Sequence, residues 1–425
     1  MTTTDVLTGA RARWLAVTSV AAGTFTIVTS EMLPVGLLTS IASTLEVSDG
    51  TAGLMMSAPG LVAAVSAPVL AITTRRLDRR VTLLALMALL AVANLAGAFA
   101  PNYPVMLAAR LLTGVSIGGF WAIAAGLGVR LVPERFVGRA TSIILAGVSV
   151  ASVLGVPAAT FLSSYAGWRT AFAAMGLVAL ALLALLATTL PPMPTTPQPQ
   201  PHPSESPAHT TEQDPRTSES PAHTTETSNP LEDRTDDRLG WLSRPLKVIL
   251  VLTVLTVSGH FAAYTYLRPF MEQVAHAGPA LISTALLLYG AAGVAGNFAA
   301  GARAARNPRA VLITLTALMA LSMAVLPLTG QTPVVLSLVL LVVWGLGYGG
   351  VGVTLQLWIM RSGGGEMGTA LFVSAFNVSI ALGAFAGGRV VDGVSTSAVM
   401  WLGVALTAVS ATVAGIWGRS RTTGS

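Results

Sequence analysis

The sequence predicts an all-α membrane protein with twelve transmembrane helices, and three observations lead to that prediction. Only 10% of the residues are charged, where soluble domains carry about 25%. Hydrophobic residues make up 53% of the chain, and the mean hydropathy is +0.71. Apolar runs close to the spanning length of about 20 residues recur along the chain. A soluble globule cannot bury so much apolar surface, so the chain is expected to use the lipid bilayer as its solvent.

The apolar runs form two groups of six. Polar clusters that contain proline, such as APNYP (100–104) and TGQTP (329–333), separate neighbouring runs and mark tight turns. We therefore expect an N-terminal six-helix bundle over 1–190 and a C-terminal six-helix bundle over 246–425. The predicted spans are 14–40, 51–73, 81–99, 104–128, 138–163 and 168–190 in the first group, and 246–271, 278–302, 309–329, 332–359, 366–390 and 397–417 in the second.

The interruption between the groups, 191–245, has a different composition. It is rich in Pro, Ser and Thr, and it repeats SESPAHTTE at 204–212 and 218–226. Such a segment cannot bury a core, so we expect a disordered cytoplasmic linker. The main interpretation is a tether between the bundles, and a regulatory or partner-binding role is the alternative. His209 and His223 recur once per repeat and make at best a weak metal site.

The distribution of basic residues predicts the topology. Twenty of the twenty-four Lys and Arg lie at the termini, in alternate loops or in the central loop. The opposite loops carry the acids Glu46, Asp49, Glu272 and Asp392. By the positive-inside rule both termini are cytoplasmic. We expect a multi-pass protein of the cell (inner or plasma) membrane.

Several function classes are disfavoured. The chain has no cysteine, which excludes disulfides and thiolate metal sites. Its basic residues sit in short clusters between helices, so we expect no nucleic-acid partner. No phosphate loop of the GK[ST] type is present, so ATP does not drive the protein directly. Because no nucleophile–base pair or ligand cluster lies within the apolar runs, we expect no enzyme activity, no cofactor and no metal.

One motif is misleading. GLGYGG (345–350) matches the dinucleotide-binding pattern G-x-G-x-x-G. That pattern needs a strand before it and a soluble βαβ unit around it, whereas this copy lies inside a long apolar run. We interpret Gly345, Gly349 and Gly352 as a small-residue face for close helix packing.

The two halves of the chain resemble each other. RRLDRRVTLL (75–84) joins the second and third helices, and ARAARNPRAV (302–311) joins the eighth and ninth. Parallel six-helix repeats are a known transporter plan, in which substrate binds near the midplane between the halves.

Short motifs then carry a family resemblance. They are TSEMLPVGLL (29–38), ARLLTG (109–114), LGVPAATF (154–161), GWRTAF (167–172) and TYLRPF (265–270). With them the chain resembles the major facilitator superfamily, in its twelve-helix drug/proton antiporter branch. It is similar to bacterial arabinose-efflux, purine-ribonucleoside-efflux and chloramphenicol-export permeases.

The resemblance implies a secondary active transporter that exports a small organic compound, a drug or a metabolite, in exchange for protons by alternating access. The alternative is proton symport or facilitated uptake of a small solute such as a sugar or nucleoside. The expected partners are a small-molecule substrate, protons and the lipid bilayer, and the expected state is a monomer.

The resemblance also implies that the loop between the second and third helices controls switching between states. Two positions depart from the family pattern, because Thr74 replaces the usual Asp and Ser66 replaces the opening Gly. Gating is therefore expected to depend on Asp78 or on other contacts. The gating-loop candidates are Arg75, Arg76, Asp78, Arg79 and Arg80.

Glu31 is the acid that lies well inside an apolar run. It follows Trp14 by seventeen residues, about 25 Å along a helix, which places it in the outer half of the membrane before a kink expected at Pro34. A carboxylate there can bind and release a proton as its exposure changes. The alternative is a structural acid that pairs with an Arg or caps broken backbone at the kink. Arg110, at similar depth, is the expected counterpart and tunes the proton affinity, or else it is structural.

The seventh helix carries a polar stripe. Thr253, Thr256, His260, Tyr264 and Arg268 are three or four residues apart and share one face. His260 is a further proton-coupling candidate, or it is hydrogen-bonded to a neighbour. The substrate-binding candidates, each of which can instead be a structural residue, are Asn94, Trp121, Tyr264, Arg268, Asn297, Gln356 and Asn377.

Overall fold

The computed structural model describes residues 3–74, 77–124, 127–193, 243–329, 334–363 and 365–417. Every regular element in these residues is helical, and twelve helical spans are long and apolar enough to cross a membrane. The predicted fold class is confirmed. Most of the linker, including His209 and His223, lies outside the described residues, which include only its ends at 191–193 and 243–245. The gating-loop candidates Arg75 and Arg76 also lie outside them.

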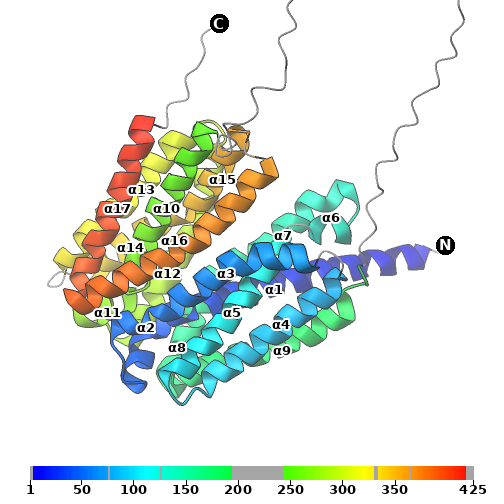
Figure 1. The fold of residues 1–425 in the computed structure, drawn as a ribbon, viewed down its shortest axis with the longest axis horizontal. Coiled ribbons are helices and arrows are strands. Elements are labelled where there is room, and N and C mark those ends of the chain that lie inside the picture. The colour runs from blue at the N-terminus through cyan, green and yellow to red at the C-terminus, as the bar shows by residue number, and fades with distance from the viewer. Residues whose placement is uncertain are drawn as a thin grey trace, which may run out of the picture.

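Six spans form the N-terminal bundle (Figure 1). In chain order its elements are α1 (Thr3–Thr44), α2 (Asp49–Ala52), α3 (Leu54–Thr73), α4 (Arg79–Ala98), α5 (Tyr103–Ala124), α6 (Leu127–Leu131), η2 (Glu134–Phe136), α7 (Val137–Val150), η3 (Ala151–Gly155), α8 (Val156–Ala166) and α9 (Trp168–Thr189).

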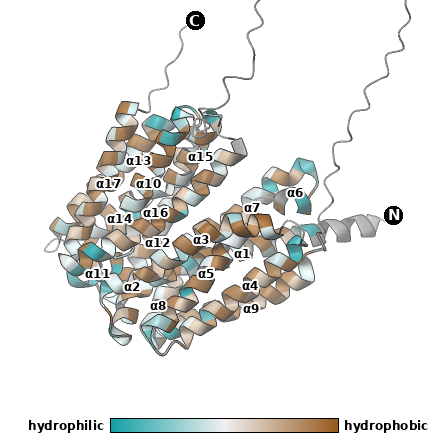
Figure 2. Cartoon of the chain, in the orientation of Figure 1, coloured by the Kyte–Doolittle hydropathy of each residue, from teal (hydrophilic) through white to brown (hydrophobic). Residues whose placement is uncertain are grey.

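The other six spans form the C-terminal bundle. Its elements are α10 (Arg244–Tyr264), α11 (Leu267–Gln273), α12 (Pro279–Ala304), α13 (Pro308–Val325), η4 (Leu326–Thr329), α14 (Val334–Gly349), α15 (Val351–Arg361), α16 (Gly365–Gly393) and α17 (Thr396–Trp417). Figure 2 shows hydrophobic residues along the lengths of the helices and hydrophilic ones gathered at their ends, as a membrane belt requires.

The bundles share a pseudo-symmetric capping contact. At the start of α4, Arg80 donates from Nη2 to the carbonyl of Ala187 near the end of α9, at 2.5 Å. At the start of α13, Arg309 donates to the carbonyls of Ala414 (2.8 Å) and Gly415 (2.5 Å) near the end of α17. The last carbonyls of a helix lack intrahelical donors, so an arginine from a neighbouring helix satisfies them. This equivalence agrees with the repeat seen in the sequence.

The bundles meet at one end of the molecule. There α2 and α3 pack against α16, α8 packs against α12, and α1 packs against α11. Figure 1 shows the bundles together at α2 and α8 and diverging toward α6 and α15. We call the end that carries α2, α11 and the junction of α16 with α17 the closed end. Val35, Met56 and Val156 belong to a buried hydrophobic cluster made otherwise of C-terminal-bundle residues, so part of the seal is apolar.

Candidate functional site

Arg110 is fully buried in α5 and holds three helices together. Its guanidinium donates to three backbone carbonyls: Nη1 to Ser30 at 2.8 Å, Nη2 to Glu31 at 2.9 Å and Nε to Met55 at 3.1 Å. The first two carbonyls belong to α1 and the third to α3. The arginine therefore links α5 to both helices through their main chains.

Two prolines explain why two of these carbonyls, those of Ser30 and Met55, need a donor. In an α-helix the carbonyl of residue i accepts the N–H of residue i+4. Four residues after Ser30 stands Pro34, and four residues after Met55 stands Pro59, and proline has no N–H. Arg110 supplies the missing donor in both helices. A structural role for Arg110 therefore has a specific cause, the two N–H donors that the prolines lack.

Glu31 lies beside this clamp with its carboxylate unbridged. The side chain is 7% exposed. Among the described residues, Arg110 contacts the backbone of Glu31, and no hydrogen bond or ion pair ends on the carboxylate. The positive charge of Arg110 still acts on the carboxylate. Because three carbonyls hold the guanidinium, the position of Arg110 does not depend on an ion pair with Glu31.

Asn94 belongs to the same polar centre. Its amide donates from α4 to the Ser30 hydroxyl at 3.1 Å and to the Leu90 carbonyl at 2.9 Å. Its Oδ1 is buried without a partner among the described residues. Asn94 therefore links α4 to the Ser30 side chain of α1, next to Glu31.

The C-terminal bundle has an aromatic centre instead. We define the aromatic centre as six rings from α10, α12 and α14: His260, Phe261, Tyr264, Tyr289, Trp344 and Tyr348. His260 stacks on Tyr348 with 3.4 Å between ring centroids and 8° between planes. Among its other neighbours, Tyr264 stacks on the imidazole with 4.9 Å between ring centroids, and Trp344 contacts the imidazole edge-on. Tyr348 is the half-buried ring of the aromatic centre.

The hydrogen bonds of His260 define its tautomer. The indole N–H of Trp344 donates to Nδ1 at 3.2 Å, so Nδ1 carries no proton. Nε2 lies 3.5 Å from the Tyr289 hydroxyl, which can accept its N–H. The imidazole is therefore neutral, and a second proton on Nδ1 would face the indole N–H directly. This geometry favours the hydrogen-bonded interpretation of His260 over proton coupling.

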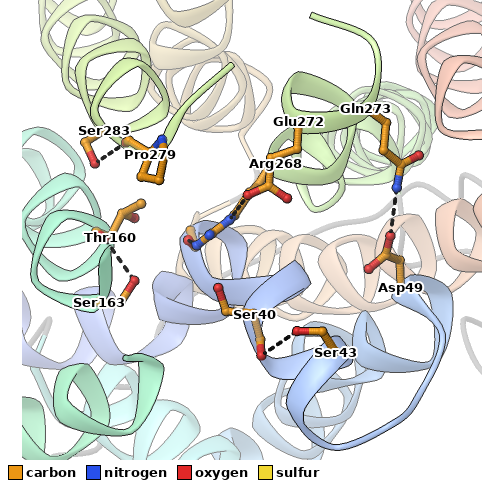
Figure 3. Close-up of polar contacts among 11 residues, drawn as sticks. Ser40, Ser43, Asp49, Thr160, Ser163, Arg268, Glu272, Gln273, Pro279 and Ser283 are labelled. Atoms are coloured by element: carbon orange, nitrogen blue, oxygen red, sulfur yellow. Dashed lines mark hydrogen bonds and ion pairs between the residues drawn. The ribbon is translucent and has the colours of Figure 1, made fainter. Parts of the chain in front are cut away.

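The predicted polar stripe of the seventh span does not act as one surface. Thr253 bonds within its own helix, to the Ile249 carbonyl, whereas Thr256 pairs with Ser410 of α17 at 2.7 Å. The helix then breaks between α10 and α11. Arg268, beyond the break, forms an ion pair with Glu272 at 2.8 Å and donates to the Gly36 carbonyl of the other bundle (Figure 3). Arg268 thus contacts the closed end.

The remaining substrate-binding candidates are dispersed. Gln356 donates to Thr369 at 2.9 Å, and Asn377 donates to the Val373 carbonyl of its own helix at 2.9 Å. Trp121 packs edge-on against Phe120 in the N-terminal bundle. Asn297 is half-buried on α12. The structure shows no shared contact that brings these four together within its described part.

The gating-loop residues Asp78, Arg79 and Arg80, which the structure describes, make contacts within their own bundle. Asp78 caps α4 by accepting the N–H of Arg80 at 2.7 Å, and it also accepts the N–H of Met193 at 3.1 Å. The N–H of Arg79 donates to the Met193 carbonyl at 3.4 Å. This loop is therefore tied to the end of α9, where the linker begins.

The glycines of GLGYGG bring α14 against α12. A Cβ added at Gly345 would lie 2.3 Å from the Tyr289 carbonyl, and one at Gly349 would lie 1.9 Å from the Gly293 carbonyl. The packing interpretation is confirmed for both. At Gly352 it is wrong, because an added Cβ there would meet nothing within 4 Å.

A comparison with protein families agrees with this fold. The model of the Major Facilitator Superfamily matches residues 20–374. The chain belongs to this superfamily. It is 33% identical over 411 residues to the transcription regulatory protein OpdE of Pseudomonas aeruginosa, with 96% of this chain and 94% of that protein covered. Among solved structures it resembles the human organic anion transporter MFSD10 (TETRAN), with a TM-score of 0.62, 18% identity and coverage of 95% and 99%.

Membership in the superfamily makes the chain a membrane transporter and gives the two centres a common setting. Sequence reasoning identified Glu31 and Arg110 as charges inside apolar runs, but it missed Tyr289, Trp344 and Tyr348. A signal was present, because Trp344 and Tyr348 are four residues apart on one helical face, as are His260 and Tyr264. Three of the six tyrosines of the chain belong to the aromatic centre, a concentration that composition alone does not reveal.

Proposed function

We propose that this transporter exports a small organic compound, a drug or a metabolite, in exchange for protons. The observation that carries the proposal is Glu31, a buried acid whose carboxylate is left unbridged beside an arginine held by carbonyls. Such an acid changes its proton occupancy when a conformational change alters its exposure. Arg110 keeps a fixed positive charge next to it and tunes its proton affinity.

The aromatic centre supplies the surface for the organic part of the substrate. Tyr348 is its half-buried ring, and we propose that it faces Glu31 of the other bundle. A substrate between them contacts an aromatic ring on one side and the proton-binding acid on the other. Binding of substrate and binding of a proton then become coupled, which exchange requires. His260 orders the rings in this scheme.

The orientation follows from the charge bias of the loops. With both termini in the cytoplasm, the closed end faces outward and the end at which the bundles diverge faces the cytoplasm. Substrate then enters from the cytoplasm in the conformation seen here. Uptake by proton symport or facilitated diffusion uses the same two conformations, so direction has to be measured.

The name of the Pseudomonas aeruginosa relative is compatible with transport. OpdE is described as a transcription regulatory protein. A membrane protein that moves an inducer across the membrane changes transcription without binding DNA. For this chain we propose such an indirect effect only.

The test uses everted membrane vesicles with a proton gradient reported by a quenched dye, and a panel of antibiotics, sugars and nucleosides. We expect one compound to dequench the dye with wild-type protein and not with Glu31→Gln, because the amide cannot carry a proton. Glu46→Gln, the same change at an exposed loop acid, is the matched control and should behave as wild type. Full-rate, proton-coupled export by Glu31→Gln would overturn the proposal.

A further inference from the structure

At the closed end, a carboxylate of one bundle caps a helix of the other. Asp392, in the last turn of α16, accepts the N–H of Gly50 at 2.9 Å and the hydroxyl of Ser48 at 2.7 Å. Ser48 is the N-cap residue of α2 and accepts the N–H of Thr51 at 3.1 Å. The first N–H groups of a helix have no intrahelical acceptor, and a carboxylate is well suited to them. We call these contacts the inter-bundle cap.

Close backbone contact holds the inter-bundle cap in register. Ala384, Gly388 and Asp392 are four residues apart and share one face of α16. On this face a Cβ added at Gly50 would lie 2.3 Å from the Gly388 carbonyl. The Tyr266 hydroxyl donates to the Ala384 carbonyl at 2.7 Å beside the same surface. The two main chains touch, so the Asp392 carboxylate reaches α2.

The inter-bundle cap differs from the other polar contacts at the closed end. The Gly36 contact of Arg268 is buried, since Arg268 is 8% exposed. Gln273 accepts the hydroxyl of Thr396 at 3.1 Å. Its amide donates across the bundles to the Asp49 carboxylate over a longer distance of 3.3 Å (Figure 3). Asp392 is exposed and makes two charge-assisted bonds from a single side chain. Water can replace both bonds, so this contact can form and break in each cycle.

We propose that Asp392 is a gating residue, whose inter-bundle cap on α2 stabilises the closed end and must break when that end opens. Its two donors lie in one bundle and its carboxylate in the other, so separation of the bundles there breaks both bonds. The proposal rests on alternating access alone. It holds whichever solute is carried, in whichever direction, and whether or not Glu31 carries a proton.

The chain offers a direct test because it has no cysteine. Met56 is 1% exposed and seals the closed end within the buried cluster of the other bundle, so Met56→Cys reports its opening. The protein is labelled in right-side-out vesicles, in which the closed end faces the medium, with a membrane-impermeant thiol reagent, and the rate of reaction is measured. Loss of the inter-bundle cap by Asp392→Ala is expected to raise the rate roughly tenfold or more, since it removes two hydrogen bonds to a charged group.

Two further variants keep the test specific. Arg389→Ala changes an exposed charge one turn earlier on α16 and should leave the labelling rate unchanged. Ser48→Ala removes one of the two bonds and should give a smaller increase than Asp392→Ala. Equal labelling of Asp392→Ala and its parent, in protein that elutes as a single folded species, would overturn the proposal. A larger increase from Arg389→Ala than from Asp392→Ala would also overturn it.

Discussion

The two bundles follow the same helical plan but have chemically different centres. In the N-terminal bundle, one arginine satisfies carbonyls on two proline-containing helices and leaves Glu31 unbridged. In the C-terminal bundle, the corresponding interior is filled by rings around one neutral histidine. Both bundles nevertheless keep the arginine cap at the end of their last helix. Capping at the helix ends is shared, whereas the residues that face the other bundle have diverged.

This difference suggests a division of roles. A buried charge is costly unless it is hydrogen-bonded, so the N-terminal centre is a rigid network, in which we propose that Glu31 titrates. Stacked rings bury large area and fix one another's orientation, so the C-terminal centre is a shaped surface. The predictions below test whether these roles are separate.

The largest effect is expected for Arg110. Replacement by Met removes three hydrogen bonds and leaves buried carbonyls without donors, so the free energy of unfolding should fall by about 3 kcal/mol or more. Arg110→Lys keeps the charge but not the forked geometry, so its loss of unfolding free energy should be smaller than that of Arg110→Met. Thermal unfolding of the purified protein in detergent measures both.

Replacing the two prolines tests whether Arg110 stabilises the protein by satisfying the carbonyls that they leave without donors. With Pro34→Ala and Pro59→Ala, the carbonyls of Ser30 and Met55 regain intrahelical N–H donors. Arg110→Met should then cost clearly less than in the wild-type background. An equal cost in both backgrounds would show that Arg110 does not act through the proline-exposed carbonyls.

The next largest effect concerns the glycines beneath the aromatic centre. A Cβ at Gly349 would lie 1.9 Å from the Gly293 carbonyl, so Gly349→Ala has to push α14 away from α12. We expect a loss of about 1–3 kcal/mol of stability. Gly352→Ala, the same change into open space on the next helix, should cost much less. Similar unfolding midpoints for the two variants would contradict this packing.

The smallest effect separates the two centres most clearly. Trp344→Phe keeps a ring but removes the donor to His260, which should cost about 1 kcal/mol. If proton coupling belongs to the N-terminal centre, the pH dependence of transport should keep its shape. Trp121→Phe, which alters a half-buried indole in the other bundle, is the matched control. A pH profile displaced by Trp344→Phe alone would assign a titrating role to His260.

Much of the fold was predictable from local sequence. All twelve spans follow from runs of apolar residues, because hydrocarbon requires each spanning segment to satisfy its backbone internally. The breaks within spans were harder to predict. The helices stop and restart near Gly53 and Tyr266, where contact between bundles, rather than propensity, sets the backbone.

The candidate site was predictable in part. A charge inside an apolar run is rare enough to stand out, so Glu31 and Arg110 were identified from position alone. The roles of Asn297, Gln356 and Asn377 could not be judged, because a polar side chain in a membrane helix serves packing as readily as binding. Arg268 looked like a residue of the seventh-helix stripe until the break after α10 placed it at the closed end.

The sequence by itself determined that this chain crosses the membrane twelve times, which loops lie on the same side, and where two prolines remove backbone donors. These are properties of composition and of spacing along one helix. Only the tertiary structure decided which arginine meets those carbonyls, which six rings gather around His260 and which carboxylate caps α2. Each of these contacts joins residues far apart in the chain. No local pattern encodes their distance, which depends on how the helices pack.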